Sequence, residues 1–151
     1  MKMKTLQKFS LLIAFAILIT NCTKSNSSNG SSCDNVCEYS LASGETAATV
    51  ATSLHGTYNV TYTFADSDSP ISKDTKATIQ ISATEMIITL AGQECVSIKN
   101  PFRVVNGNQD IFRDNCASNL SYHISTKPDG SFNEINVFDL GTEWYGQFTE
   151  D

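Results

Sequence analysis

Apolar and polar residues alternate over much of the chain beyond residue 55. The clearest stretch is 58–64, where Tyr58, Val60, Tyr62 and Phe64 are separated by Asn or Thr. Because the side chains of a β-strand point alternately to opposite faces, this pattern predicts a strand whose four apolar residues share one buried face. Similar patterns predict further short strands at 76–82, 85–91, 95–99, 102–105, 109–113, 120–124, 132–140 and 143–148.

Turn residues separate these segments. Asn106-Gly107 is a favoured two-residue hairpin turn, and residues 127–130, Lys-Pro-Asp-Gly, have the backbone preferences of a β-turn. Many short strands with frequent turns predict an all-β domain, either a small antiparallel β-barrel or a sandwich of about eight strands. Residues 34–41 and 45–54 are predicted to form short helical turns, so the domain is expected to begin with a short helical segment.

The first 21 residues have the pattern of an export signal. Three lysines within the first eight residues precede an unbroken apolar run at 11–19. A helix that spans a membrane needs ~20 apolar residues, so this run is too short to be a permanent anchor. A basic start followed by a short apolar run is typical of a secretory signal peptide.

The residues that end this segment, Ile19-Thr20-Asn21-Cys22, resemble a relaxed version of the bacterial lipoprotein signal. That resemblance implies removal of residues 1–21 and lipidation of Cys22. The alternative is an ordinary secretory signal followed by an incidental cysteine. Residues 22–32 are rich in Ser and Asn and are predicted to form a flexible lipidated tether. The predicted organisation is therefore a signal peptide at 1–21, a tether at 22–32 and a β domain at 33–151.

The charge of the chain limits its partners. Removal of residues 1–21 takes three of the ten Lys and Arg and none of the sixteen Asp and Glu, which changes the formal charge from −6 to −9. An acidic chain lacks the basic surface that binds nucleic acid. It is also repelled by anionic lipid headgroups. The predicted location is the bacterial outer membrane, held by lipid on Cys22, on either the periplasmic or the cell-surface face.

Four cysteines remain once Cys22 is assigned to lipid, namely Cys33, Cys37, Cys95 and Cys116. An even number in an exported chain predicts two disulfides, and no pair has the Cys-x-x-Cys spacing common at zinc sites. A hairpin turn at 106–107 brings Cys95 and Cys116 close together. We therefore expect the pairs Cys95–Cys116 and Cys33–Cys37. The other two pairings, which would join the N-terminal segment to the barrel, remain alternatives.

The entry to the first long strand, Leu54-His55-Gly56-Thr57-Tyr58, resembles the start of a lipocalin-like domain, where a Gly-x-Trp element opens the first strand. Tyr58 stands where that family has Trp. The resemblance covers about ten residues. It implies a small β-barrel, and it implies that a small apolar ligand could be carried inside that barrel.

Candidate chemistry is sparse. There is no Gly-x-Ser-x-Gly nucleophile elbow, and neither His55 nor His123 lies in a metal-binding motif. We therefore expect no enzyme activity, no cofactor and no metal site. Trp144 and Tyr145 are the candidate binding residues. Because neighbours on a strand face opposite sides, one of these two aromatic side chains should point out of the core, where it could anchor a partner.

These features favour a membrane-anchored binding module. Three kinds of binding compete. The first is a surface adhesin that contacts host macromolecules. The second is a lipocalin-like carrier of a small apolar ligand. The third is a periplasmic inhibitor that resembles the small lipidated lysozyme inhibitors in size, anchor and barrel class, and that would bind an envelope protein.

Lipidation of Cys22 is directly testable. If Cys22 carries lipid, the native protein partitions into the detergent phase, because each buried methylene contributes ~0.8 kcal/mol to membrane attachment. The variant Cys22→Ala is then released or mislocalised. Mass spectrometry that finds an unmodified N-terminus on the mature protein would contradict this prediction.

Overall fold

The computed structural model describes residues 33–139 and 144–151. The predicted signal peptide, the tether and Cys22 lie outside the described residues. Within the described part of the chain, no helix is long and apolar enough to cross a membrane.

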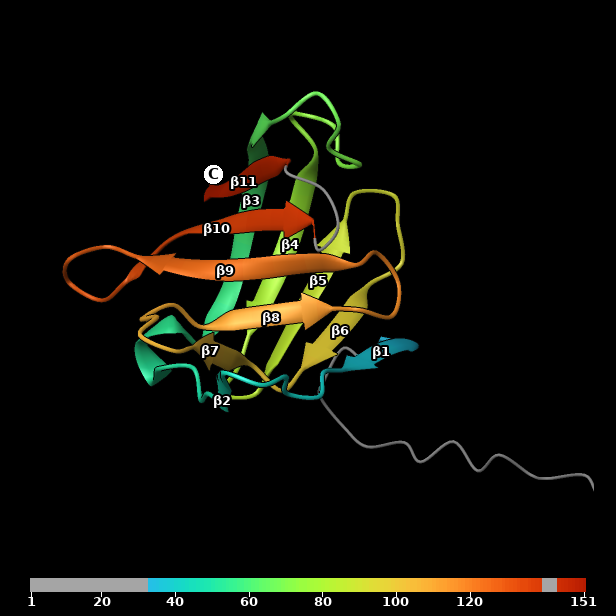
Figure 1. Cartoon of the computed structure of the whole chain (residues 1–151). Coiled ribbons are helices and arrows are strands. Elements are labelled where there is room, and N and C mark those ends of the chain that lie inside the picture. Colours follow the sequence, from blue (N-terminus) through green and yellow to red (C-terminus); the bar gives the residue numbers. More distant parts are fainter. Residues whose placement is uncertain (1–32, 140–143) are drawn as a thin grey trace, which may run out of the picture. The chain divides into compact units, whose positions relative to one another are not determined.

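The described residues form one mixed sheet that curls into a half-barrel (Figure 1). The strand order is β1-β6-β5-β4-β3-β11-β10-β9-β8-β7-β2. All neighbouring strands are antiparallel except β1 and β6. The strands are β1 (Asn35–Glu38), β2 (Glu45–Ala47), β3 (Gly56–Ala65), β4 (Lys76–Ile81), β5 (Glu85–Leu90), β6 (Val96–Lys99), β7 (Phe102–Val104), β8 (Ile111–Asp114), β9 (Leu120–Thr126), β10 (Phe132–Asp139) and β11 (Tyr145–Glu150).

The all-β prediction is confirmed, and each segment predicted from residue 58 onward contains a strand. The predicted helical N-terminal segment is wrong. The chain there forms β1, β2 and a three-residue 3-10 turn, η1 (Thr52–Leu54). These two strands add to the expected number. Their few residues form strands because β6 and β7 supply backbone partners, an effect of tertiary structure that overrides weak local propensity.

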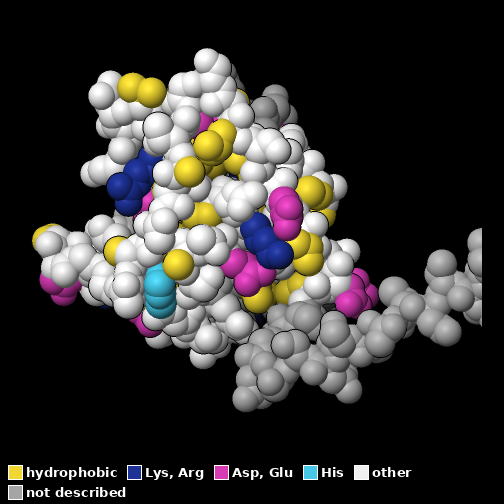
Figure 2. Space-filling model, turned by 90° about the horizontal axis from the view of Figure 1, so that it is seen from below, with side chains coloured by type: hydrophobic (Ala, Val, Ile, Leu, Met, Phe, Trp, Pro, Cys, Tyr) yellow, Lys and Arg dark blue, Asp and Glu magenta, His cyan; other side chains and the backbone are white. Residues whose placement is uncertain are grey.

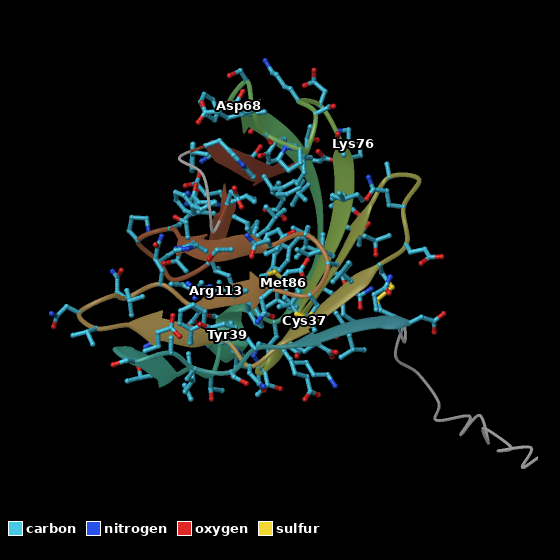
Figure 3. All side chains as sticks on the ribbon, turned by 45° about the vertical axis from the view of Figure 1, so that its right-hand side comes forward. Cys37, Tyr39, Asp68, Lys76, Met86 and Arg113 are labelled. Carbon is cyan, nitrogen blue, oxygen red and sulfur yellow. A yellow bond between two sulfur atoms is a disulfide. The ribbon has the colours of Figure 1, made fainter. Side chains whose placement is uncertain are left out.

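Curling of the sheet encloses one main core. In Figure 1, β8 to β11 cross in front of β3 to β6, and the inward-facing side chains of both layers fill the space between them. Met86, labelled in Figure 3, is fully buried in this core. Its largest fully buried companions include Tyr62, Phe112, Phe148, Ile79, Ile98 and Ile135. The buried Leu54 of η1 adds to the same cluster.

The expected face of the first long strand is correct only in part. Val60 and Tyr62 are fully buried and Tyr58 packs against the core, but Phe64 is 45% exposed. The register explains this difference, because Tyr62 pairs with Phe148 while Phe64 pairs with Gln147, which is only one residue away on β11. A β-bulge therefore lies between Tyr62 and Phe64. An extra residue in a strand moves every later side chain to the opposite face.

A close approach of β3 and β11 requires glycine at position 146. A Cβ atom at Gly146 would overlap the hydroxyl end of Tyr62. The Tyr62 hydroxyl forms a hydrogen bond of 2.9 Å with the Ser69 hydroxyl, so the ring is held in the space that a side chain would need.

The N-terminal segment connects the two edges of the curled sheet. At one edge β1 pairs with β6, and at the other edge β2 pairs with β7. Between these edges β6 lies beside β8, although the described residues of these two strands form no ladder. We call the line along which β6 lies beside β8 the seam. We call residues 35–47 the clasp, because this short stretch of chain pairs with a strand on each side of the seam.

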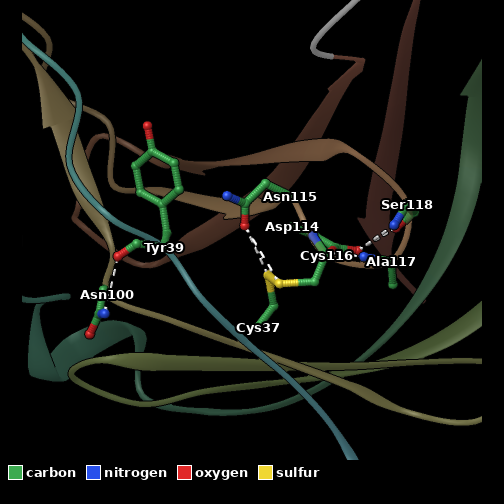
Figure 4. Close-up of a disulfide and its surroundings, with 8 residues drawn as sticks. All are labelled: Cys37, Tyr39, Asn100, Asp114, Asn115, Cys116, Ala117 and Ser118. Atoms are coloured by element: carbon green, nitrogen blue, oxygen red, sulfur yellow. Dashed lines mark hydrogen bonds between the residues drawn. A yellow bond between two sulfur atoms is a disulfide. The ribbon is translucent and has the colours of Figure 1, made fainter.

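The disulfides correct the predicted pairing. Cys33 bonds Cys95 and Cys37 bonds Cys116, with Cα–Cα distances of 5.4 and 5.7 Å. The first bond lies on the β1–β6 side of the seam. The second bond joins β1 to the turn after β8, and therefore crosses the seam (Figure 4).

The structure departs from the predicted hairpin both at the turn and at Pro101. Phe102 pairs with Ile111, but residues 105–110 join β7 to β8. The β-turn in this connection is closed by a hydrogen bond from Gly107 N to Val104 O, so Asn106-Gly107 is not the expected two-residue turn. Asn100 then takes a left-handed conformation with φ 62°, and the chain turns into β6, which pairs with β5. Cys95 is thereby carried away from β8 and β9. Because proline cannot donate a ladder hydrogen bond, a break at this point is expected.

The two disulfides should differ in their effect on the seam. They close loops of similar sequence separation, 62 and 79 residues, so chain entropy gives each a similar contribution of ~4 kcal/mol. Only Cys37–Cys116 crosses the seam. The double variant Cys37→Ala/Cys116→Ala should therefore speed amide hydrogen exchange in the clasp, β7 and β8. The matched variant Cys33→Ala/Cys95→Ala should leave β7 and β8 protected. Equal exchange in both variants would contradict the role assigned to the seam.

Candidate binding face on β9, β10, β11 and β3

Four rings form a continuous row on the outer face of the sheet. Ring centroids are 4.7 Å apart between His123 and Phe138, 5.3 Å between Phe138 and Tyr145, and 5.4 Å between Tyr145 and Phe64. The rings come from β9, β10, β11 and β3 in spatial order. We call these four side chains the aromatic row. Phe64 and Phe138 are 45% and 37% exposed, and the other two are half-buried.

Strand pairing fixes where each ring lies. Phe138 is directly opposite Tyr145, and the bulge in β3 turns Phe64 onto the same face. Trp144 precedes Tyr145 and is buried in the main core, with 7% of its surface exposed. Of the two candidate binding residues, the structure therefore brings only Tyr145 to the outer face.

Polar side chains lie against the row. Asn136 is paired with His123 on one side and with Gln147 on the other, and Gln147 is paired with Phe64. The two amides thus lie between the two end rings of the row. The Tyr145 hydroxyl donates a hydrogen bond to Asn136 Oδ1, and Gln147 Nε2 donates to Glu134. These contacts hold the polar groups in fixed orientations on a rigid sheet.

The surroundings shift the proton affinity of two members of the row. Burial raises the pKa of the Tyr145 hydroxyl, and the Glu134 charge adds to this effect. Burial lowers the pKa of His123 to about 4, and the positive charge of Arg113 lowers it further. Both side chains are therefore uncharged at neutral pH. Ser121 hydrogen bonds His123 Nε2 at 2.9 Å, but Ser121 is only 2% exposed, so this pair is poorly placed to act on a ligand.

A separate cluster on the outer face secures the clasp. The guanidinium of Arg113 lies 4.9 Å from the Tyr39 ring centroid and 4.8 Å from that of Phe102. It also pairs with Glu45 Oε1 at 3.2 Å, and Tyr39 donates a hydrogen bond of 2.8 Å to Glu45. Burial alone would raise the pKa of Glu45, but hydrogen bonds from Ala42 and Tyr39 and the Arg113 charge lower it.

Within the described residues, one group of possible metal ligands is committed to other bonds. Cys37, Asp114 and Cys116 have ligand atoms within 4.8 Å of one another. The two sulfurs form a disulfide, and the Asp114 carboxylate accepts hydrogen bonds from the amides of Cys116, Ala117 and Ser118 (Figure 4). In this oxidised form the group stabilises a turn.

The surface seen from below in Figure 2 carries charges of both signs. Lys and Arg side chains lie beside Asp and Glu side chains, with small apolar areas between them. Two of the ion pairs in the described residues are Lys99 of β6 with Glu38 of β1 at 3.6 Å, and Arg103 of β7 with Asp110, just before β8, at 2.7 Å. Neither sign of charge dominates this view.

Two members of the row were missed in the sequence. Phe138 follows the buried Val137, so strict alternation alone places it outside. Phe64 carries no such signal, because only the bulge turns it outward. No family model, no curated protein and no solved structure matches this chain. The binding face therefore has to be interpreted from its own residues.

The lowered pKa of His123 makes stability depend on pH. Because the folded value is about 4 and the ordinary value is 6.5, only the unfolded chain takes up this proton between those two pH values. The contribution of neutral His123 to the free energy of unfolding is therefore complete above pH 6.5 and is lost as the pH falls toward 4. Urea denaturation at about pH 7, 5.5 and 4.5 should show a smaller loss for His123→Gln than for the wild type. An equal loss of stability in His123→Gln and in the wild type would contradict the assignment.

Proposed function

We propose that this protein is a lipid-anchored bacterial lipoprotein of the outer membrane that works by binding, and that the aromatic row is its binding face. Lipid on Cys22 holds it at the membrane, and the partner is a host or envelope macromolecule. The observation that carries the proposal is the exposure of Phe64 and Phe138 beside Tyr145 on one outer face of the sheet.

Phe64 and Phe138 are exposed, and each contacts the ring of Tyr145. Two exposed phenylalanines around one tyrosine are an unusual use of apolar surface. Full burial of a Phe side chain stabilises a fold by ~1.5–3 kcal/mol, and part of this gain is lost at Phe64 and Phe138, which are 45% and 37% exposed. The bulge in β3 moves Phe64 out of a face that its sequence pattern would bury. Bulges commonly re-aim a side chain next to a functional site, and contiguous exposed apolar surface marks an interaction site.

The scaffold favours binding on the outside. Interior positions of the described strands are filled by large side chains, among them Tyr62, Phe112 and Phe148. The row itself lies on four neighbouring strands of a sheet whose edges the clasp joins. A face of this kind is already ordered before a partner arrives, so binding costs little conformational entropy.

The disulfide at Cys33, the first described residue, fits a protein that is anchored through an N-terminal tether. Cys33 is bonded to Cys95 just before β6. A pull on a tether that ends at residue 32 would be carried by this bond rather than by the four residues of β1. An adhesin held by lipid experiences such a pull whenever its partner moves.

Attachment of coated beads tests the proposal. Beads that carry the full chain are applied to a layer of fixed mammalian cells and to bacterial envelope fragments. The variant Phe138→Ser should lower attachment about tenfold to whichever surface binds the wild type, since aromatic anchors dominate binding energy. Val105→Ser is the matched control, because Val105 is 64% exposed and lies outside the row.

Two results would contradict the proposal. One is equal attachment of Phe138→Ser and the wild type. The other is an equal loss in Val105→Ser. Protease added to intact cells then assigns the face, because digestion of the domain places the partner outside the cell and protection places it in the envelope.

A further inference from the structure

The polar groups beside the aromatic row show which class of ligand it fits. Asn136 and Gln147 lie between the end rings, and Glu134 lies next to them. A ligand that covers the four rings must also cover the two amides, and it then lies beside the Glu134 carboxylate that both amides contact. The ligand must therefore offer apolar surface to the rings and hydrogen-bond donors and acceptors to the amides and the carboxylate.

A dry protein interface fits this face poorly. The cores of such interfaces are depleted in charged residues, and a carboxylate covered by apolar side chains loses its hydration without a matching gain. Glu134 accepts hydrogen bonds from Gln147 and Asn136, which leaves other lone pairs of the carboxylate to be satisfied by whatever covers it. A ligand that is rich in hydroxyl groups supplies those donors.

A polyanion fits poorly as well. The chain has a formal charge of −6, and Glu134 adds a negative charge at the face itself. Single-stranded nucleic acid stacks on aromatic rings, but its affinity depends on a basic groove along the backbone. A small apolar ligand is also disfavoured, because an open sheet face leaves most of such a ligand in water.

We propose that the aromatic row binds an uncharged glycan chain that lies across β9, β10, β11 and β3. This inference rests on the proposed function and names the ligand class for the same face. The C–H faces of sugar rings lie on the aromatic rings, whose negative π faces attract them. The sugar hydroxyls donate to Glu134 and exchange hydrogen bonds with the amides of Asn136 and Gln147.

The extent of the row fits a chain rather than a single sugar. Its members come from four strands, and neighbouring strands in a sheet are ~4.8 Å apart. One sugar ring covers one or two aromatic rings. Contact with all four rings therefore requires several linked sugars, and each added contact should lengthen the residence of the ligand.

Gel retardation tests this inference. The full chain, kept in a detergent without sugar groups, is run in native gels that contain a neutral β-glucan, galactomannan or dextran, and in a gel with heparin. At least one neutral polymer should retard the protein, and heparin should not. No retardation by any neutral polymer, or retardation by heparin alone, overturns the inference.

Two variants separate a glycan from an apolar partner. Phe138→Ser removes a ring, and Gln147→Leu removes an amide while it keeps the side chain's size. Both should weaken glycan retardation about tenfold, because each takes away one kind of contact. Val105→Ser and Gln93→Leu are the matched controls at exposed positions elsewhere, and they should bind as the wild type does. Unchanged retardation of Gln147→Leu overturns the inference, and urea denaturation checks that each variant is folded.

The bead assay separates this inference from the proposed function. Whichever surface binds the wild-type beads is treated with periodate, which cleaves sugar diols, or with protease. Attachment that depends on Phe138 and is lost after periodate supports a glycan ligand. Attachment that depends on Phe138 but survives periodate and is lost after protease overturns the glycan and leaves the binding face intact. Attachment that does not depend on Phe138 overturns both.

Discussion

Closure of a curled sheet by a short N-terminal clasp is the constraint on which the rest of the structure depends. An open sheet has two edges with unpaired backbone groups, and β1 and β2 cover both of them with a few consecutive residues. Such short strands are weak by themselves. The two disulfides hold the clasp in place, and Cys37–Cys116 also ties β1 to the far side of the seam. The main core forms inside the layers that this closure keeps together.

The clasp also supports one end of the binding face. Arg113 lies between Tyr39 and Phe102 and pairs with Glu45, so a half-buried charge, two rings and the clasp form one unit. On the other side Arg113 is paired across the ladder with Ser121, which hydrogen bonds His123 at the end of the aromatic row. The charge that holds the clasp thus helps to keep His123 neutral. Loss of the clasp would therefore change the surroundings of His123 at this end of the aromatic row.

The bulge in β3 gives up burial of the Phe64 side chain and places that ring on the outer face of the sheet. Without the extra residue, Phe64 would continue the buried face of Val60 and Tyr62, and the small Ala65 would face outward. With it, Ala65 packs against the core and Phe64 joins Tyr145 outside. Gly146 allows β3 and β11 to approach closely at this point, because a side chain there would overlap Tyr62. The binding face we propose is therefore built from a local departure from regular pairing.

The sequence by itself determined the fold class and the positions of the strands beyond residue 55, because a period of two with one apolar face has no other compact solution. It also determined that Phe138 and Val137 face opposite sides of the sheet, and that one of Trp144 and Tyr145 faces outward. Only the tertiary structure decided the rest. The disulfide pairing depended on the turn of the chain at Asn100 and Pro101, between β6 and β7, and β1 and β2 exist because distant strands pair with them. Phe64 reached the outer face through a bulge, which shifts register through a partner strand and so leaves no mark in the pattern of the strand itself.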